Sequence, residues 1–135
     1  MSRKGGTLIF ITLFALDRFT KLFALFTSAP ALTFNERAFF FFDDSRGSLV
    51  VLVVLVTVLG AWFGYELYMR ASTLGMIASA SIVAGALSNT LDRLRYGAII
   101  DWIPLYGVSV YNLADVFIMV GCVLALVSFF RRKTV

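Results

Sequence analysis

The chain has 135 residues, 60% of them hydrophobic and 15% charged, whereas a soluble domain has about half its residues apolar and roughly a quarter charged, so a membrane protein is expected. Histidine is absent and cysteine occurs once, which excludes Ser-His and Cys-His nucleophiles and an intrachain disulfide, and argues against a thiol or imidazole metal site. The net charge of +4 does not indicate a nucleic-acid partner, because five basic residues flank apolar segments near the two ends: Arg3, Lys4, Arg131, Arg132 and Lys133.

Four apolar segments along the chain are each close to the length that spans a bilayer. They cover about residues 7–26, 49–69, 72–91 and 108–130. The short turn at Arg70 and Ala71 predicts an antiparallel helical hairpin from the second and third segments. The expected fold is therefore an all-α membrane protein with four transmembrane helices, in a single integral membrane domain that covers residues 1–135.

The basic residues predict an orientation in the membrane. Acids accompany the basic residues of only one side, which carries Glu36, Asp43, Asp44, Asp92 and Asp101 beside Arg37, Arg46, Arg93 and Arg95. The other side carries Arg3, Lys4, Arg70, Arg131, Arg132 and Lys133. Since cytoplasmic loops have an excess of basic residues, both termini are predicted to be cytoplasmic.

The connection between the first two spans has strand-like character. Leu32, Thr33 and Phe34, and the aromatic run from Phe39 to Phe42, are of residue types that favour strands. We expect a small extracytoplasmic, β-like and aromatic segment here. It would either cover a site or only anchor the chain at the lipid interface.

Ionisable residues inside the predicted spans require partners, because a charge at membrane depth costs about 2.5 kcal/mol or more. Asp17 and Lys21 have i, i+4 spacing with the acid first, which predicts an ion pair on one helix face. Arg18 lies about 100° around the helix and must find another partner or extend toward water. We interpret the Asp17 and Lys21 pair as support for the interior of the bundle.

Two pairs with i, i+3 spacing lie at the predicted outer ends of the third and fourth helices. They are Asn89 with Asp92, and Asn112 with Asp115 in the first turns of the fourth helix. Asp101 lies on the loop between them. The predicted topology brings these acids and amides together, with Arg93 and Arg95 as their counter-charges.

Two carboxylates held close together can share one proton, so that one acts as a general base on water while the other polarises a carbonyl group. Such clusters also occur in proton and cation pathways. A small transporter or a structural membrane subunit therefore stays open as an alternative. A Ser-Lys hydrolase, in which Lys21 activates Ser88 or Ser109, is a further alternative, although the neighbouring acid favours the charged lysine.

Four segments in chain order resemble the signature blocks of the lipoprotein signal peptidase (signal peptidase II) family. The family blocks are D-x-x-[ST]-K, G-x-x-x-N-x-x-D-R, G-x-x-x-D-[FW] and [FY]-N-x-A-D. The matching segments are residues 17–21, 85–93, 97–102 and 111–115. With the four spans, this resemblance covers nearly the whole chain.

The resemblance implies roles for the matching residues. Asp101 and Asp115 match the two catalytic aspartates. Residues that bind substrate or support this pair are matched by Asn89, Arg93, Asn112 and, in a block similar to N-x-G-x-[AS]-F, Asn35. The residues matched to structural positions are Asp17, Lys21 and Asp92. The chain departs from the family at Arg37 and Ser88, where glycine is usual, and in a short interval between the two catalytic positions.

The resemblance also implies the activity. The family removes signal peptides from diacylglyceryl-modified prolipoproteins at the outer face of the bacterial plasma membrane. The expected partners are this lipid-modified substrate and membrane lipids, without nucleic acid. A monomer is expected, and no metal or organic cofactor is implied.

Overall fold

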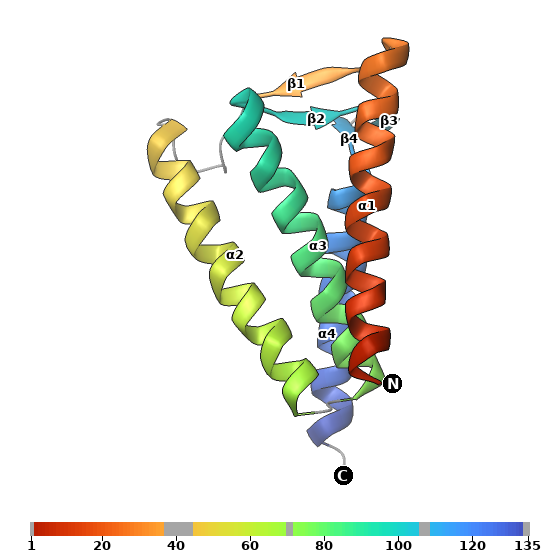
Figure 1. Cartoon of the computed structure of the whole chain (residues 1–135), viewed down its shortest axis with the longest axis vertical. Helices are drawn as coiled ribbons and strands as arrows, with labels where there is room; N and C mark the ends of the chain where they lie inside the picture. The colour runs from red at the N-terminus through yellow and green to blue at the C-terminus, as the bar shows by residue number, and fades with distance from the viewer. Residues whose placement is uncertain (1, 37–44, 70–71, 106–108, 134–135) are drawn as a thin grey trace.

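The structure, a computed structural model, describes residues 2–36, 45–69, 72–105 and 109–133, and contains four long helices. They are α1 (Arg3–Thr27), α2 (Ser45–Tyr68), α3 (Thr73–Tyr96) and α4 (Leu113–Lys133). They run up and down along the long axis, with both termini at one end (Figure 1). The four predicted apolar segments are therefore helices, and α2 and α3 form the predicted hairpin; the turn at Arg70 and Ala71 lies outside the described residues.

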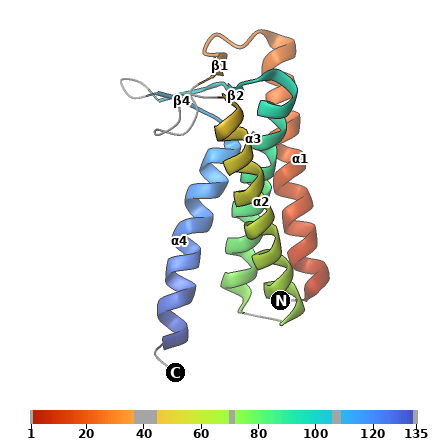
Figure 2. The same cartoon turned by 90° about the vertical axis from the view of Figure 1, so that its left-hand side faces the viewer.

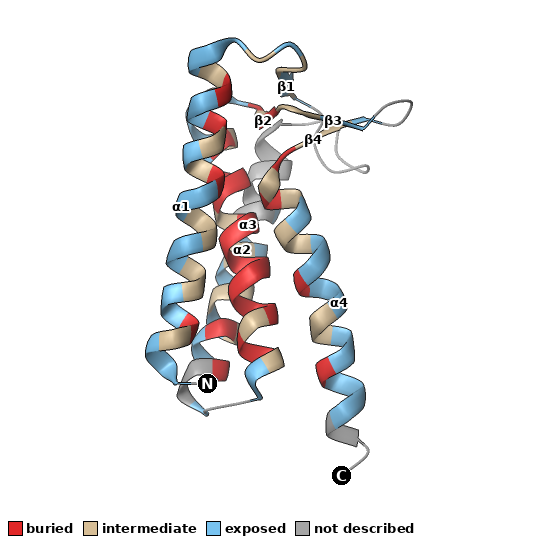
Figure 3. Cartoon of the chain, turned by 90° about the vertical axis from the view of Figure 1, so that its right-hand side faces the viewer, coloured by how far each residue is buried: buried red, intermediate tan, exposed pale blue. Residues whose placement is uncertain are grey.

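The central helix is α3, which contacts α1, α2 and α4. Most of the residues along this helix are buried, as Figure 3 shows. Small side chains let the neighbouring backbones approach closely. At Gly85, an added Cβ would collide with the carbonyl oxygen of Ala114 in α4, so this glycine sets the contact distance between the two helices.

Large apolar side chains cover the outward faces of the other helices. On α1, Phe19 and Phe26 are 67% and 90% exposed, and on α4, Met119 and Phe130 are each 63% exposed. Apolar surface of this extent indicates a lipid environment. Among the described residues, α3 and the part of α4 from Leu113 to Arg131 are each long and apolar enough to cross a membrane.

Two short antiparallel strand pairs lie at the end of the molecule opposite the termini (Figure 2). The first joins β1 (Thr33–Asn35) to β2 (Ile99–Asp101), with Thr33 opposite Asp101. The second joins β3 (Ile103–Leu105) to β4 (Ser109–Tyr111). The strand predicted at Thr33 and Phe34 is therefore present, whereas residues 39–42 lie outside the described part of the chain.

Two helix boundaries differ from the prediction. The third helix continues to Tyr96 and ends where Gly97 adopts a positive φ of 71°, which glycine tolerates best. The fourth helix begins at Leu113 rather than near Val108, because Ser109–Tyr111 pair as β4. Asn112 consequently lies immediately before the helix, and the prediction that placed it in the first turns of the helix is wrong.

Candidate active site

Asp101 and Asp115 are brought together by a single asparagine. Asp101 is the last residue of β2, and its Oδ1 accepts a hydrogen bond of 2.6 Å from Asn112 Nδ2. Its Oδ2 accepts one of 3.1 Å from Asn35 Nδ2. Both oxygens of this buried carboxylate therefore have amide donors, supplied by the chain before α4 and by β1.

Asp115 lies in the first turn of α4 and forms a reciprocal cap with Asn112. The Asn112 Oδ1 accepts from the backbone N–H of Asp115 at 3.0 Å, and Asp115 Oδ2 accepts from the backbone N–H of Asn112 at 3.4 Å. This is the capping-box arrangement of a helix N-terminus. Asn89 Nδ2 donates to the other oxygen, Oδ1, at 2.9 Å. The i, i+3 spacing of Asn112 and Asp115 thus comes from a helix cap.

Burial raises the pKa of Asp101 above its ordinary value, and the negative charge of Asp115 acts in the same direction. The hydrogen bonds from Asn35 and Asn112 and the positive charge of Lys21 oppose this rise. The two aspartates interact electrostatically, as a pair that shares a proton must.

Lys21 supplies a buried positive charge next to this site. Lys21 Nζ forms ion pairs with Asp17 Oδ2 at 2.9 Å and with Asp92 Oδ2 at 2.7 Å, and donates to Asn89 Oδ1 at 2.8 Å. The predicted i, i+4 ion pair is confirmed. Through Asn89, the hydrogen bonds continue from Lys21 to Asp115.

The counter-charges of Asp92 come from α1. Arg18 pairs with Asp92 Oδ1, and its NH1 also donates to Ser88 Oγ at 3.1 Å. Arg18 therefore finds a partner inside the bundle, which is one of the two possibilities that the sequence left open.

The prediction that Arg93 and Arg95 balance the acids of the site holds only in part. Arg93 interacts electrostatically with Asp101, but Arg95 is exposed and its guanidinium lies 5.3 Å from the Tyr96 ring centroid.

The Asp17 carboxylate of α1 contacts both α3 and α4. Its Oδ2 accepts from Ser88 Oγ, and its Oδ1 accepts from the backbone N–H of Ala114 at 2.8 Å. The second contact places a carboxylate of α1 at the N-terminus of α4, where the helix dipole favours negative charge. A residue interpreted only as bundle support thus also fixes the turn that carries Asp115.

The structure brings nearly all the predicted residues into one connected network. Three asparagines donate hydrogen bonds directly to the two aspartates: Asn35, Asn89 and Asn112. Lys21 forms ion pairs with Asp17 and Asp92, and Asn89 connects it to Asp115. The sequence reasoning did not place Arg18 or Ser88 among the residues that support the site. Two signals could have found them: the charge of Arg18 inside a span, and a hydroxyl at a position where the family usually has glycine.

The contacts do not support a Ser-Lys nucleophile. Lys21 Nζ forms ion pairs with two carboxylates, and the Ser88 hydroxyl donates its hydrogen bond to Asp17 rather than to Lys21. Ser109 is exposed on β4. Two carboxylates joined through Asn112, on a scaffold of long apolar helices, match instead the arrangement of an aspartic peptidase.

The chain belongs to the signal peptidase (SPase) II family, an aspartic protease family whose model matches residues 9–131. A lipoprotein signal peptidase of Clostridium novyi (strain NT) is 31% identical over 143 residues, which cover 93% of this chain and 97% of the relative. The lipoprotein signal peptidase of Clostridioides difficile (strain 630) is 30% identical over 145 residues, with coverages of 94% and 97%. The recognition made from the four sequence blocks is confirmed.

Solved structures share the fold. A bacterial membrane enzyme structure determined by the in meso method at 2.3 Å resolution superimposes with a TM-score of 0.77, at 19% identity, over 96% of this chain and 90% of that one. A second, determined at 1.9 Å by the same method, gives a TM-score of 0.75 at 20% identity, over 93% and 92%. The chain therefore has the same fold as these two structures.

Proposed function

We propose that this chain removes the signal peptide from diacylglyceryl-modified prolipoproteins, with Asp101 and Asp115 as the catalytic pair. One observation carries the assignment of these residues. Asn112 hydrogen-bonds to Asp101 and to Asp115, so one side chain holds both carboxylates at the same place. The family membership and the lipoprotein signal peptidase relatives support the substrate class.

In the proposed reaction, the ionised member of the pair takes a proton from a water molecule as that water attacks the scissile carbonyl carbon. The protonated member donates its proton to the carbonyl oxygen, giving a neutral tetrahedral intermediate. Collapse of the intermediate breaks the C–N bond. The first carboxyl group passes the proton that it took from water to the leaving nitrogen, and a hydroxyl group of the intermediate returns a proton to the second carboxylate. The raised pKa of Asp101 supports a pair that keeps one proton between its two carboxyl groups.

The surrounding residues are proposed to act in two groups. Asn35, Asn89 and Asn112 orient the carboxylates, and the electrostatic interaction of Arg93 with Asp101 supports a place for Arg93 beside the substrate. The structural group holds the helices together through buried ion pairs and consists of Asp17, Lys21 and Asp92.

We also propose a single domain of four membrane spans with cytoplasmic termini and the strands on the outer side. The catalytic pair would then lie at the outer boundary of a bacterial plasma membrane. A diacylglyceryl group could stay in the bilayer while the adjacent peptide bond reaches the two aspartates. Each buried CH₂ of the lipid contributes about 0.8 kcal/mol, so the lipid would fix the depth of the substrate.

The direct test is cleavage of a lipidated prolipoprotein peptide by the purified chain, followed as a gel shift. The wild type should release the signal peptide, and Asp101→Asn should not. A transporter using the same acids would instead move protons or cations in proteoliposomes and leave the peptide intact. Cleavage by Asp101→Asn at the wild-type rate would exclude Asp101 from the catalytic pair.

A further inference from the structure

A cleft with a volume of about 300 Å³ opens between α1 and α3, and four residues line it: Arg18 of α1, and Leu91, Leu94 and Arg95 of α3. The two leucines are 38% and 56% exposed, so part of the cleft is apolar. The other part carries two guanidinium groups. None of the four residues occupies a fixed position of the family blocks described above.

The cleft lies on the face of α3 opposite the catalytic pair. Asn89 of α3 donates to Asp115 and so marks the face that turns toward α4. At about 100° per residue, Leu91 and Leu94 lie about 140–160° around the helix from Asn89. The cleft is therefore separate from the site of cleavage proposed above.

Both arginines have N–H groups that remain available to an anion. Arg18 uses NH1 for Ser88 and Asp92, whereas its Nε and NH2 groups donate to none of the described residues. Arg95 is exposed, and within the described part of the chain it has neither a hydrogen bond nor an ion pair. The dipole of α3 favours a cation at Arg95, in the last turn of the helix, but leaves its N–H donors unused.

The surroundings of these arginines are apolar. Going back along α1 from Arg18, Phe14 and Ile11 follow on the same face, and Ile11 is 52% exposed. A charge that faces hydrocarbon needs a counter-charge, and Arg95 has no acid beside it among the described residues. Planar guanidinium groups bind phosphate oxygens through paired N–H donors, and exposed leucines contact acyl chains. An anionic phospholipid has both of these parts.

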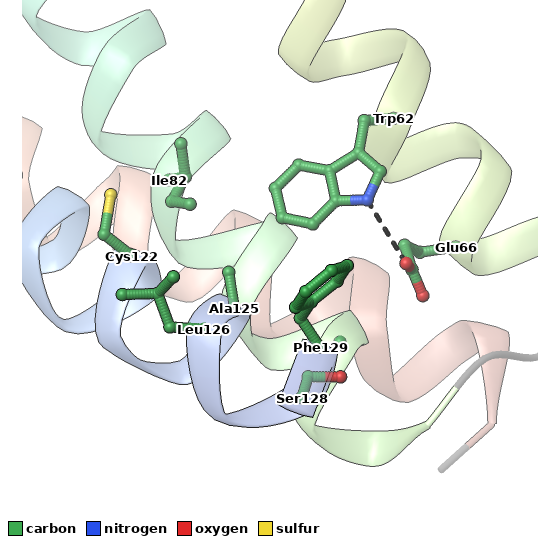
Figure 4. A pocket seen from close by; sticks show the side chains of 9 residues that line it. Trp62, Glu66, Ile82, Cys122, Ala125, Leu126, Ser128 and Phe129 are labelled. Carbon is green, nitrogen blue, oxygen red and sulfur yellow. Dashed lines mark hydrogen bonds between the residues drawn. The ribbon is translucent and has the colours of Figure 1, made fainter. Parts of the chain in front are cut away.

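A larger cavity, of about 520 Å³ between α2 and α4, does not combine these features (Figure 4). Its lining is mainly apolar and includes one acid, Glu66, whose side chain accepts from Trp62 Nε1 at 3.2 Å. No basic residue is among the described residues that line it. Charge therefore selects an anionic ligand at the cleft between α1 and α3 and not at this cavity.

We propose that the cleft between α1 and α3 binds an anionic phospholipid of the surrounding bilayer, with its phosphate group on Arg18 and Arg95 and an acyl chain against Leu91 and Leu94. The inference goes beyond the proposed cleavage and does not rest on it. Arg18 also pairs with Asp92, which in turn pairs with Lys21. A bound lipid therefore contacts the buried network directly and should stabilise the folded chain.

The test is lipid binding to the purified chain in detergent, measured by native mass spectrometry. Phosphatidylglycerol and phosphatidylcholine with the same acyl chains are compared. The wild type should bind phosphatidylglycerol about tenfold more tightly, as expected for one charge interaction that is partly removed from water. Arg95→Gln should bind the two lipids within about twofold of each other. Arg95→Lys should regain only part of the preference, because lysine keeps the charge without the paired donors.

Two controls separate this site from general attraction between opposite charges. Lys4→Gln removes the same charge from an exposed residue at the other end of α1 and should keep the wild-type preference. Glycerol phosphate has the phosphate group without acyl chains and should not displace bound phosphatidylglycerol. Arg95 carries the test because it is exposed and lies outside the buried ion pairs, so its variants should fold.

Equal affinities of the wild type for the two lipids would overturn the inference, and so would an unchanged preference in Arg95→Gln. Loss of the preference in Lys4→Gln would assign it to net charge rather than to this cleft. Displacement of the lipid by glycerol phosphate at equal concentration would replace the phospholipid by a free phosphate ligand and also overturn the inference. No peptide is cleaved in this experiment, so each of these outcomes leaves the proposed function intact.

Discussion

The Asp17 carboxylate accepts a hydrogen bond from the backbone N–H of Ala114, although the two residues lie 97 positions apart in the chain. The contact is buried and joins the middle of α1 to the first turn of α4. Since the residue after Ala114 is Asp115, the position of one proposed catalytic carboxylate depends on a side chain of another helix.

Replacing Asp17 with asparagine should therefore reduce both stability and cleavage. The substitution removes one of the two carboxylates that neutralise Lys21, and breaking a buried ion pair costs about 3–5 kcal/mol. Thermal unfolding in detergent and cleavage of a lipidated peptide measure the two effects. Thr20→Val is the matched control, because the Thr20 hydroxyl bonds only to a backbone carbonyl of its own helix in the described structure. Wild-type stability of Asp17→Asn would show that the network does not hold the bundle together.

The two proposed catalytic aspartates should behave as one unit. Asp101→Asn and Asp115→Asn should each reduce cleavage by at least about 10³-fold, because one carboxylate cannot serve as base and proton donor in the same step. The double variant should be no worse than either single one. Rates are compared in single-turnover assays. If one single variant kept a tenth of the activity, the aspartates could not share catalysis.

Stability should fall with rising pH because of Asp101. Its native pKa is raised, so the native state binds more protons than the unfolded state between the ordinary carboxyl value of about 3.9 and the raised value. Stability from this group is thus present at low pH and is lost as the pH rises through that window. The measurement is the unfolding temperature of wild type and Asp101→Asn from pH 4 to 8. The unfolding temperature of the variant should rise relative to that of the wild type as the pH increases. A pH-independent difference would mean that Asp101 titrates normally.

Ser88→Ala should destabilise the protein by about 1–3 kcal/mol, because the hydroxyl donates to buried Asp17 and accepts from Arg18. Ser88→Gly, the residue usual in the family, should cost roughly 1 kcal/mol more through helix propensity. Ser81→Ala is the control, since that hydroxyl bonds to the Ile77 carbonyl one turn earlier in the same helix. Equal losses in Ser88→Ala and Ser81→Ala would indicate that the contact between helices contributes nothing.

Reporter fusions should test the proposed topology. A reporter after Met69, beyond the end of α2, is expected in the cytoplasm, and reporters after Glu36 or Leu105, near the strands, are expected outside. The basic termini and the placement of both strand pairs at the opposite end support this orientation. Glu36 and Leu105 reporting opposite sides would contradict the model of four spans.

The sequence alone predicted the four helices, identified the family and named the candidate residues of the site. Helices form wherever some 20 apolar residues follow one another, because a bilayer requires internal hydrogen bonding of the backbone. The i, i+4 spacing of Asp17 and Lys21 predicted their ion pair for an equally local reason. The four family blocks predicted the other candidate residues of the site, because they preserve the order and spacing of the polar residues.

Only the tertiary structure decided which partners those residues have. Arg18 and Ser88 are linked to Asp92 and Asp17 across an interface between α1 and α3, and no local spacing encodes such contacts. The helix cap at Asn112 also depended on β4, whose pairing with β3 delays the start of α4. Partners at long sequence separation are selected by packing and by the cost of an unpaired charge in an apolar interior, and both depend on the folded arrangement.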